Sequence, residues 1–567
     1  MEKLNANQIS SLSLDHLGLV AAVIHDLDLI NKIDKILPLH IEKGVRITMG
    51  QRASGMILNA LGFVDTRLYM YPEYLADKPV DLLIGEGVKA SDFTQDALGR
   101  LLDAIHLYGC ENFFAKLAYP IAVENNLLGQ SIHIDTSSIS LEGAYDFSAE
   151  ELADLPKPPA GSLATPEINY GHSKDHRPDL KQMVINMATT GAAGFPLWME
   201  THSGNASDQK ILHEACIRMK AFVTKFDEER EFIYVADSAI YSSCVKQTDH
   251  LIWLTRVPER SNYAIDLLQL ADENIFWEDY GQGYKACPVG STYQDIKQIW
   301  LIVFSDQAYK REIITFEKKI VKDQSTHEKT LAQLGAQDFQ CKVDAEKAAV
   351  KLGKYWKHHS LSHKIIEVKK YDKSGRPKAT DAPEKIIYKI TGTVIQDKEA
   401  IELSRRRKGR FILATNDINE DKIAPANMLS CYKEQAATEG GFRFIKGNHF
   451  NVSSVLLKNP NRVSALLVIM TLSLMVYAFA QYKLREALKK TNQTIPNQKN
   501  KEVNNPTISR VFRLFFGIQL LRIVTSDLEQ SMVINLNPVR IKIIKLFGTK
   551  AMQIYGLDEK IGDNITK

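Results

Sequence analysis

Apolar residues recur every three or four positions in residues 17–33 and 97–121, a spacing that predicts amphipathic helices. Strand-like alternation is scarce before residue 130. We therefore expect residues 1–128 to form a helical N-terminal domain for binding or for assembly. Periodicity alone does not choose between these two roles.

After Gly129 the pattern changes to short apolar strands separated by polar loops. Residues 208–226 interrupt the strands with an amphipathic helix, for which Ser207 is the expected N-cap. Strands mixed with a helix in this way predict an α/β core. The predicted strands are residues 131–138, 183–188, 196–200, 232–237 and 251–257.

From residue 258 the chain becomes Lys-rich and alternating, which predicts strands at 298–304 and 385–395 and a charged helix at 328–357. The earlier strand pattern returns at 410–416, so an insertion interrupts one α/β core. The expected domains are residues 1–128, helical; 129–257, first part of the core; 258–409, a basic α+β insertion; 410–490, the last core strand and a helix; and 491–567, a polar linker with a helical tail.

The composition is that of an ordinary globular protein, because 44% of the 567 residues are hydrophobic and 25% are charged; this excludes a wholly disordered chain. The net charge of +3 is unevenly spread. Residues 363–410 contain 14 Lys and Arg against 7 Asp and Glu, a local charge of +7, so the remainder carries −4. A basic insertion favours a polyanionic partner, and a merely solvated surface is the alternative.

The six cysteines are scattered without a CxxC pair, and the N-terminal residues lack the apolar core of a signal peptide. We therefore expect no structural zinc, no disulfide framework and a cytoplasmic location. Residues 463–480 carry no charge over 18 positions, close to the roughly 20 residues of a membrane span. Polar residues within this segment favour a buried helix of a soluble core, and a membrane anchor is the alternative.

Two aspartates end short apolar strands, Asp135 in SIHIDTSS and Asp237 in FIYVAD. Ligands gather at such strand ends in α/β folds. Two neighbouring carboxylates are costly to bury unless a cation compensates them, and hard oxygen ligands suit Mg²⁺ or Mn²⁺. Aspartates in these positions also cap the element that follows, so the pair alone leaves both interpretations open.

A third carboxylate lies in CYKEQAATEGGFRFIKG, residues 431–447. On a continuous helix, Tyr432, Gln435, Glu439 and Lys446 fall within about 60° on either side of one line. Glu434 points nearly the opposite way, so Glu439 is the preferred acid. Its neighbours fit a metal site bordered by groups that bind phosphate.

These residues resemble the signature of DDE transposases of bacterial insertion sequences, in the insertion-sequence-four branch with the pattern Tyr-(2)-Arg-(3)-Glu-(6)-Lys. Tyr432, Glu439 and Lys446 match the pattern, and Gln435 stands where Arg is usual. The resemblance extends to IHIDTSSIS, YGHSKDHRPDLKQ, VADSAIYS and FRFIKG with the apolar helix after it. In total it spans residues from about 10 to about 550.

The resemblance implies an RNase H-like mixed-sheet core in which Asp135, Asp237 and Glu439 are catalytic and hold Mg²⁺, with Mn²⁺ as a substitute. It further implies a bacterial, nucleoid-associated enzyme without membrane contact, acting as at least a homodimer on double-stranded DNA. The expected reaction is cut-and-paste transposition: binding of terminal repeats, cleavage, and strand transfer into target DNA. Because a neutral amide binds phosphate less well than Arg, a decayed DNA-binding protein without catalysis is the alternative.

Further residues are candidates for contacts with DNA phosphates. Tyr432, Gln435 and Lys446 border the expected metal site, and we expect the head group of Gln435 to approach a phosphate. The remaining candidates are Arg256 at a strand end and the basic run Arg405, Arg406 and Arg407. The histidines and aspartates of residues 170–182 could suggest zinc, but the neighbouring Lys and Arg make a loop close to DNA the preferred interpretation.

Overall fold

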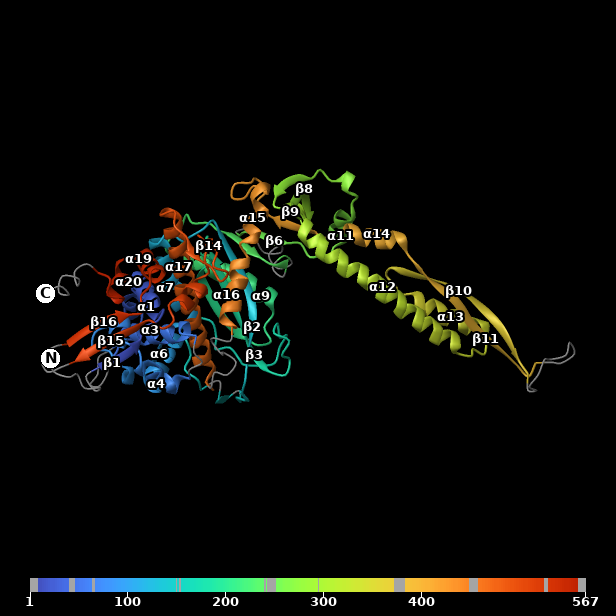
Figure 1. Ribbon diagram of the computed structural model, residues 1–567. Helices are drawn as coiled ribbons and strands as arrows, with labels where there is room; N and C mark the ends of the chain where they lie inside the picture. Colours follow the sequence, from blue (N-terminus) through green and yellow to red (C-terminus); the bar gives the residue numbers. More distant parts are fainter. Residues whose placement is uncertain are drawn as a thin grey trace. The chain divides into compact units, whose positions relative to one another are not determined.

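The computed structural model divides the chain into two compact units (Figure 1). One unit comprises Met1–Leu254 with Ser430–Lys567, and the other comprises Thr255–Leu429. The predicted insertion, residues 258–409, lies within the second unit, and the predicted domain boundaries stay predictions. The structure describes residues 9–39, 46–63, 67–148, 150–151, 154–238, 241, 251–293, 295–371, 383–447, 457–524 and 529–558.

The N-terminal part of the first unit is mostly helical, as the periodicity predicts. Each of the two long predicted stretches is in fact two helices, broken where the backbone turns at Asp28 (φ 51°) and at Gly109 (φ 92°). Thr48 begins α3 with a capping box formed with Gln51. The helices are α1 (Leu17–Asp26), α2 (Leu29–Ile36), α3 (Met49–Leu61), α4 (Tyr71–Ala76), α5 (Val80–Leu83), α6 (Gln95–Tyr108) and α7 (Cys110–Glu124).

The C-terminal tail differs from the expected helical segment because it contains strands. β15 (Gln519–Val524) pairs antiparallel with β1 (Ile9–Ser13) and with β16 (Glu529–Ile534). The tail is therefore joined to the first residues of the chain by a three-stranded sheet. Its other elements are β13 (Ile495–Pro496), β14 (Glu502–Val503), α18 (Ile508–Leu514), α19 (Pro538–Phe547) and α20 (Thr549–Ile554).

The apolar segment 463–480 lies within α17 (Pro460–Lys490). Its most apolar window has a mean hydropathy of 2.3, which meets the requirement for a membrane span, but 89% of that window is buried inside the protein. Arg462 at its start is bound by both carboxylate oxygens of Asp103, at 2.7 Å each. This burial favours the helix of a protein core over a membrane anchor.

The sheet of the first unit contains the strands that the sequence predicts, in the order β4-β3-β2-β5-β6. β2 runs antiparallel to β3 and parallel to β5, so the sheet is mixed. Almost every residue of β2 is buried, which indicates that both faces of the sheet are covered. The strands are β2 (Ser131–Leu141), β3 (Lys181–Thr190), β4 (Phe195–Ser203), β5 (Ile233–Ala236) and β6 (Ile252–Arg256), the last of which crosses the unit boundary.

Helices pack on this sheet, among them α7, which contacts β4. α9 (Asp208–Thr224) lies where the sequence predicts it, and Ser207 occupies the N-cap position, although its side chain makes no capping hydrogen bond. α16 (Ala436–Ile445) packs against β2 and β3, and α17 packs against β4. The fold is therefore a mixed α/β structure in this unit, in agreement with the predicted class.

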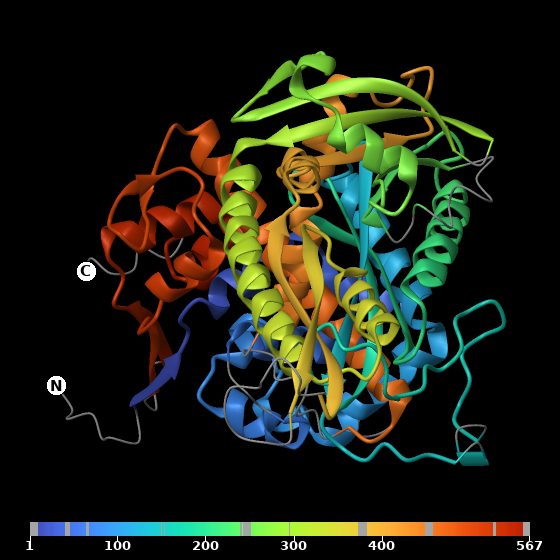
Figure 2. The same cartoon turned by 90° about the vertical axis from the view of Figure 1, so that its right-hand side faces the viewer.

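The second unit has its own antiparallel strands in the order β12-β9-β8-β7, and a separate ribbon of two strands, β10 and β11. The predicted helix 328–357 is instead the end of a longer helix followed by a second one, because α12 begins at Asp306 with Ser305 as N-cap. Both helices run beside the β10–β11 ribbon (Figure 2). The elements are α11 (Asn262–Gln269), β7 (Glu278–Gly281), β8 (Tyr284–Tyr293), β9 (Ile296–Ser305), α12 (Asp306–Ala336), α13 (Lys342–Gly353), β10 (His359–Lys370), β11 (Lys385–Gln396), α14 (Lys398–Arg406), β12 (Arg410–Thr415) and α15 (Pro425–Lys433), the last of which crosses the unit boundary.

Candidate active site

The two aspartates predicted from the strand ends come together through the pairing of β2 with β5. In this parallel pair His133 lies opposite Val235. Asp135 lies two residues further along β2, and Asp237 is the first residue after β5, so the two carboxylates lie at neighbouring positions of adjacent chain segments; paired strands lie about 4.8 Å apart. Their charges interact, because Asp237 contributes to the raised pKa of Asp135.

Asp135 lies in a site that disfavours its negative charge. The pKa of its carboxyl is raised to about 6, chiefly by burial and to a smaller extent by the nearby charges of Asp237 and Asp208. The Lys174 ammonium and the Thr136 N–H, which donates to Asp135 Oδ1 at 2.7 Å, act in the opposite direction. An additional cation beside Asp135 would relieve the surplus of negative charge.

Lys174 is a residue of this site whose role the sequence does not reveal. Its ammonium donates to the carbonyl oxygen of Thr136 at 2.8 Å and to Thr136 Oγ1 at 2.9 Å. It also forms an ion pair of 3.0 Å with Asp208, the first residue of α9. All three N–H donors of the ammonium therefore have acceptors, and Lys174 ties the strand of Asp135 to α9.

The prediction of one continuous helix over residues 431–447 is wrong, because the helix is interrupted by a turn between α15 and α16. Gln435 lies at this break, 7% exposed, and its Nε2 donates to the carbonyl oxygen of Ile134 at 3.2 Å. Thr438 Oγ1 donates to the carbonyl oxygen of His133 at 3.1 Å. These two contacts attach the start of α16 to β2 immediately before Asp135, so Gln435 is buried here instead of facing solvent.

The remaining signature residues are divided among different elements by the same break. Tyr432 is half-buried in the last turn of α15, and Glu439 is exposed in the first turn of α16. Glu434 lies between the two helices, with Oε2 3.4 Å from Nε2 of His133. The signature is therefore carried by two helices joined at Glu434 and Gln435, and a shared face for its residues stays a prediction.

Lys446 follows α16 and forms an ion pair of 2.6 Å with Asp175. Since Asp175 follows Lys174 in the sequence, the loop of residues 170–182 contacts both β2, which carries Asp135, and the end of α16. Asp179 forms an ion pair with Arg177, so Asp175 and Asp179 are both paired with cationic side chains. This arrangement argues against zinc in the loop and agrees with its polar, basic character.

In the described residues no group of three His, Cys, Asp or Glu side chains is arranged to hold a metal ion. Asp135 and Asp237 supply two hard carboxylates with a surplus of negative charge. Mg²⁺ is usually bound by one or two carboxylates together with water and substrate phosphates. The pair therefore fits this ion, and Glu439 as a third ligand stays a prediction.

The predicted DNA-binding arginines lie in the second unit, where Glu259 is shared by Arg256 and Arg407, and Glu402 is shared by Arg405 and Arg406. Arg256 also stacks on the ring of Phe411. Compensated side chains leave less charge for a phosphate, and their contact with DNA stays a prediction. The pairs are Arg256 with Glu259 at 3.3 Å, Arg405 with Glu402 at 3.6 Å, Arg406 with Glu402 at 3.5 Å and Arg407 with Glu259 at 2.5 Å.

A second feature that the sequence does not reveal is a buried charge cluster around Glu200 in β4. Arg218 of α9 binds its carboxylate through two nitrogens, at 2.8 and 2.9 Å, and His202 lies at 2.9 Å. Burial alone raises the pKa of Glu200, but the hydrogen bonds from His202 and Arg218 and the charge of Arg218 outweigh it and lower the pKa to about 2. The cluster fixes α9 to the sheet.

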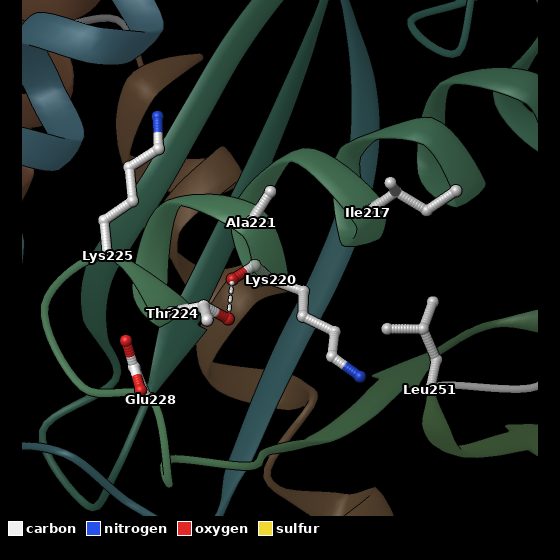
Figure 3. Close-up of a pocket in the computed structure, with 7 residues that line it drawn as sticks. All are labelled: Ile217, Lys220, Ala221, Thr224, Lys225, Glu228 and Leu251. Atoms are coloured by element: carbon white, nitrogen blue, oxygen red, sulfur yellow. Dashed lines mark hydrogen bonds between the residues drawn. The ribbon is translucent and has the colours of Figure 1, made fainter.

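A hollow of about 660 Å³ lies on the later part of α9 and contains Ile217, Lys220 and Lys225 among its lining residues (Figure 3). Glu228 is the only acidic side chain among these lining residues. Ile217 follows Asp208 by nine residues, roughly 14 Å along the helix axis. Neither aspartate of the pair is among the residues that line the hollow.

Comparison with known proteins agrees with an enzyme that acts through clustered carboxylates. Residues 132–476, which include both aspartates and Glu439, match the family described as "Transposase DDE domain". The chain therefore belongs to the DDE transposases. Residues 9–119 match a second family, described as "Domain of unknown function (DUF4277)".

One solved structure is similar over most of the chain. It is described as the "Cryo-EM structure of piggyBac transposase synaptic complex with hairpin DNA (SNHP)", with 8% identity and a TM-score of 0.31. The similarity covers 90% of this chain and 82% of that chain. The search of curated proteins found no match.

Proposed function

We propose that this DDE transposase binds the terminal repeats of an insertion sequence, cleaves the DNA ends and transfers them to target DNA by a cut-and-paste route. The observation that carries the proposal is the parallel register of β2 and β5, which makes Asp135 and Asp237 neighbours. Together with the family, it supports an RNase H-like core. The Tyr-Arg-Glu-Lys branch is proposed from Tyr432, Glu439 and Lys446.

In the proposed reaction water attacks a phosphodiester and releases a 3′-OH, which then attacks a phosphodiester of the target. When bound, Mg²⁺ would supply the positive charge that favours the attacking oxygen as a nucleophile and stabilises the leaving oxygen. Asp135 in β2 and Asp237 directly after β5 would hold the ions, and Glu439 in α16 would be the third ligand. Lys174 keeps the end of β2 in position, and Lys446 exchanges Asp175 for a phosphate.

The test is cleavage of duplex DNA that ends in the repeat, with Mg²⁺ and purified full-length protein, followed by detection of 3′-OH ends. Glu439→Gln should abolish cleavage and leave end binding within about a few-fold, because only a metal ligand is lost. Glu434→Gln, five residues earlier and close to His133, is the matched variant and should cut. The reverse result would assign the third carboxylate to Glu434.

A second candidate function is binding of the same DNA without catalysis. It is favoured by the neutral, buried Gln435 in place of an arginine. Failure of the wild-type protein to nick end DNA with either Mg²⁺ or Mn²⁺, while it still binds the repeat, would establish this alternative.

The assembly and location are proposed on the same basis. Joining two DNA ends requires at least a homodimer on DNA, and sedimentation with repeat DNA tests this. A cytoplasmic, nucleoid-associated enzyme follows from its substrate. The burial of α17 supports the absence of a membrane anchor.

A further inference from the structure

The β10–β11 ribbon of the second unit has two different faces. The strands pair antiparallel from His359 with Gln396 to Lys370 with Lys385. Alternate side chains, among them Leu361 and Ile390, pack into an apolar core with residues of α12 and α13. The side chains between them lie on the opposite face of the ribbon, which this core does not use.

The outward face is basic and hydroxylated. By alternation it carries four serines or threonines and no acidic residue. Two aliphatic side chains on it are substantially exposed, Ile366 at 45% and Ile395 at 48%, whereas Ile387, near Lys385, is fully buried, so the face is covered at that end. Its lysines are Lys364, Lys370, Lys385 and Lys389.

The positive charge of this face is only partly compensated. Asp338 is shared by Lys370 at 2.5 Å and Lys389 at 3.3 Å. Lys364 and Lys385 are exposed, and within the described part of the chain no ion pair involves either of them. Each arginine of the run at residues 405–407 lies within 4.0 Å of a carboxylate, whereas in the described residues these two lysines of the ribbon do not.

We propose that the outward face of the β10–β11 ribbon binds duplex DNA, with Lys364 and Lys385 on phosphates. Each strand has 12 residues and is therefore about 40 Å long, close to the roughly 34–36 Å of one turn of duplex DNA. A two-stranded ribbon fits the major groove, where Ser, Thr and Lys side chains contact the flanking phosphates. The assignment rests on the proposed function, since a transposase must hold duplex DNA.

The test measures binding of the full-length protein to a labelled duplex at several salt concentrations, without divalent metal. Lys364→Gln with Lys385→Gln should lower the slope of log affinity against log salt by up to about 1.8, which is 0.9 for each lost phosphate contact. Lys347→Gln with Lys351→Gln removes two exposed lysines of α13 and should keep the wild-type slope. Replacing Lys364 and Lys385 with Arg should also keep the slope.

An unchanged slope for the Lys364 and Lys385 variant, or an equal loss for the α13 variant, would overturn the assignment. So would a change in oligomeric state at unchanged DNA binding, because the face would then contact a second copy of the chain. Cleavage of repeat DNA is measured separately with Mg²⁺. If the wild type cuts DNA but the Lys364 and Lys385 variant keeps the wild-type slope, only the assignment of the ribbon is refuted. If the wild type never cuts DNA but the slope of the variant falls, only the proposed function is refuted.

Discussion

Replacing Asp135 with Asn should make the metal-free protein more stable while it abolishes DNA cleavage. Burial raises the pKa of Asp135 from its ordinary value of 3.8 to about 6. At neutral pH the folded protein therefore keeps an ionised carboxylate in a site that disfavours the charge. The difference of roughly 2 pKa units corresponds to about 3 kcal/mol at 1.36 kcal/mol per unit.

The pH dependence follows from the direction of this shift. Between the ordinary pKa and the raised pKa the folded protein binds more protons than the unfolded chain, so its stability falls as the pH rises. Because Asn carries no charge at any pH, the stability of Asp135→Asn does not show this fall with rising pH. In EDTA we expect the variant to melt several degrees above the wild type at about pH 7.5 and to match it at about pH 4.

Two comparisons complete the assay. Mg²⁺ should raise the melting temperature of the wild type and leave Asp135→Asn unchanged, because an ion bound by the folded state stabilises it. Asp208→Asn removes a more exposed carboxylate that is paired with Lys174, and it should lose up to about 1 kcal/mol instead of gaining stability. The reasoning is refuted if Asp135→Asn is no more stable than the wild type at about pH 7.5. It is also refuted if the gain in stability at about pH 4 equals the gain at about pH 7.5.

Three further substitutions test other parts of the site. Glu200→Gln leaves Arg218 without its buried partner and should lower the free energy of unfolding, measured in urea at neutral pH, by about 3–5 kcal/mol. The pKa of Glu200 is lowered to about 2, so the wild type has its full stability advantage above the ordinary pKa of 4.5. The advantage disappears as the pH falls through about 2. Lys174→Met should lower the cleavage rate by about tenfold or more with end binding kept, since its acceptors at Thr136 lose their donor, and an equal loss of binding would instead assign Lys174 to DNA. Gln435→Arg introduces a charge at a buried position and should lower the melting temperature without faster cleavage, whereas cleavage about tenfold faster would restore a phosphate contact for this residue.

The sequence by itself determined the features that depend on local pattern. The strands that carry Asp135 and Asp237 were predictable because short apolar runs bounded by polar residues form buried strands in most contexts. α17 was predictable as an apolar helix, and the change in composition near residue 258 marked the second unit. These signals require no knowledge of which segments become neighbours.

Only the tertiary structure decided which elements meet. Asp135 and Asp237 are about 100 residues apart in the chain, and the pairing of β2 with β5 makes them neighbours. The break at Gln435 coincides with hydrogen bonds to the carbonyl groups of β2, which helical periodicity cannot reveal. Likewise, the glutamate that pairs with Arg407 lies 148 residues earlier in the chain, whereas Arg405 and Arg406 pair with the nearby Glu402. Long-range pairing of charges and strands follows from the packing of the whole chain, and local sequence pattern carries no record of it.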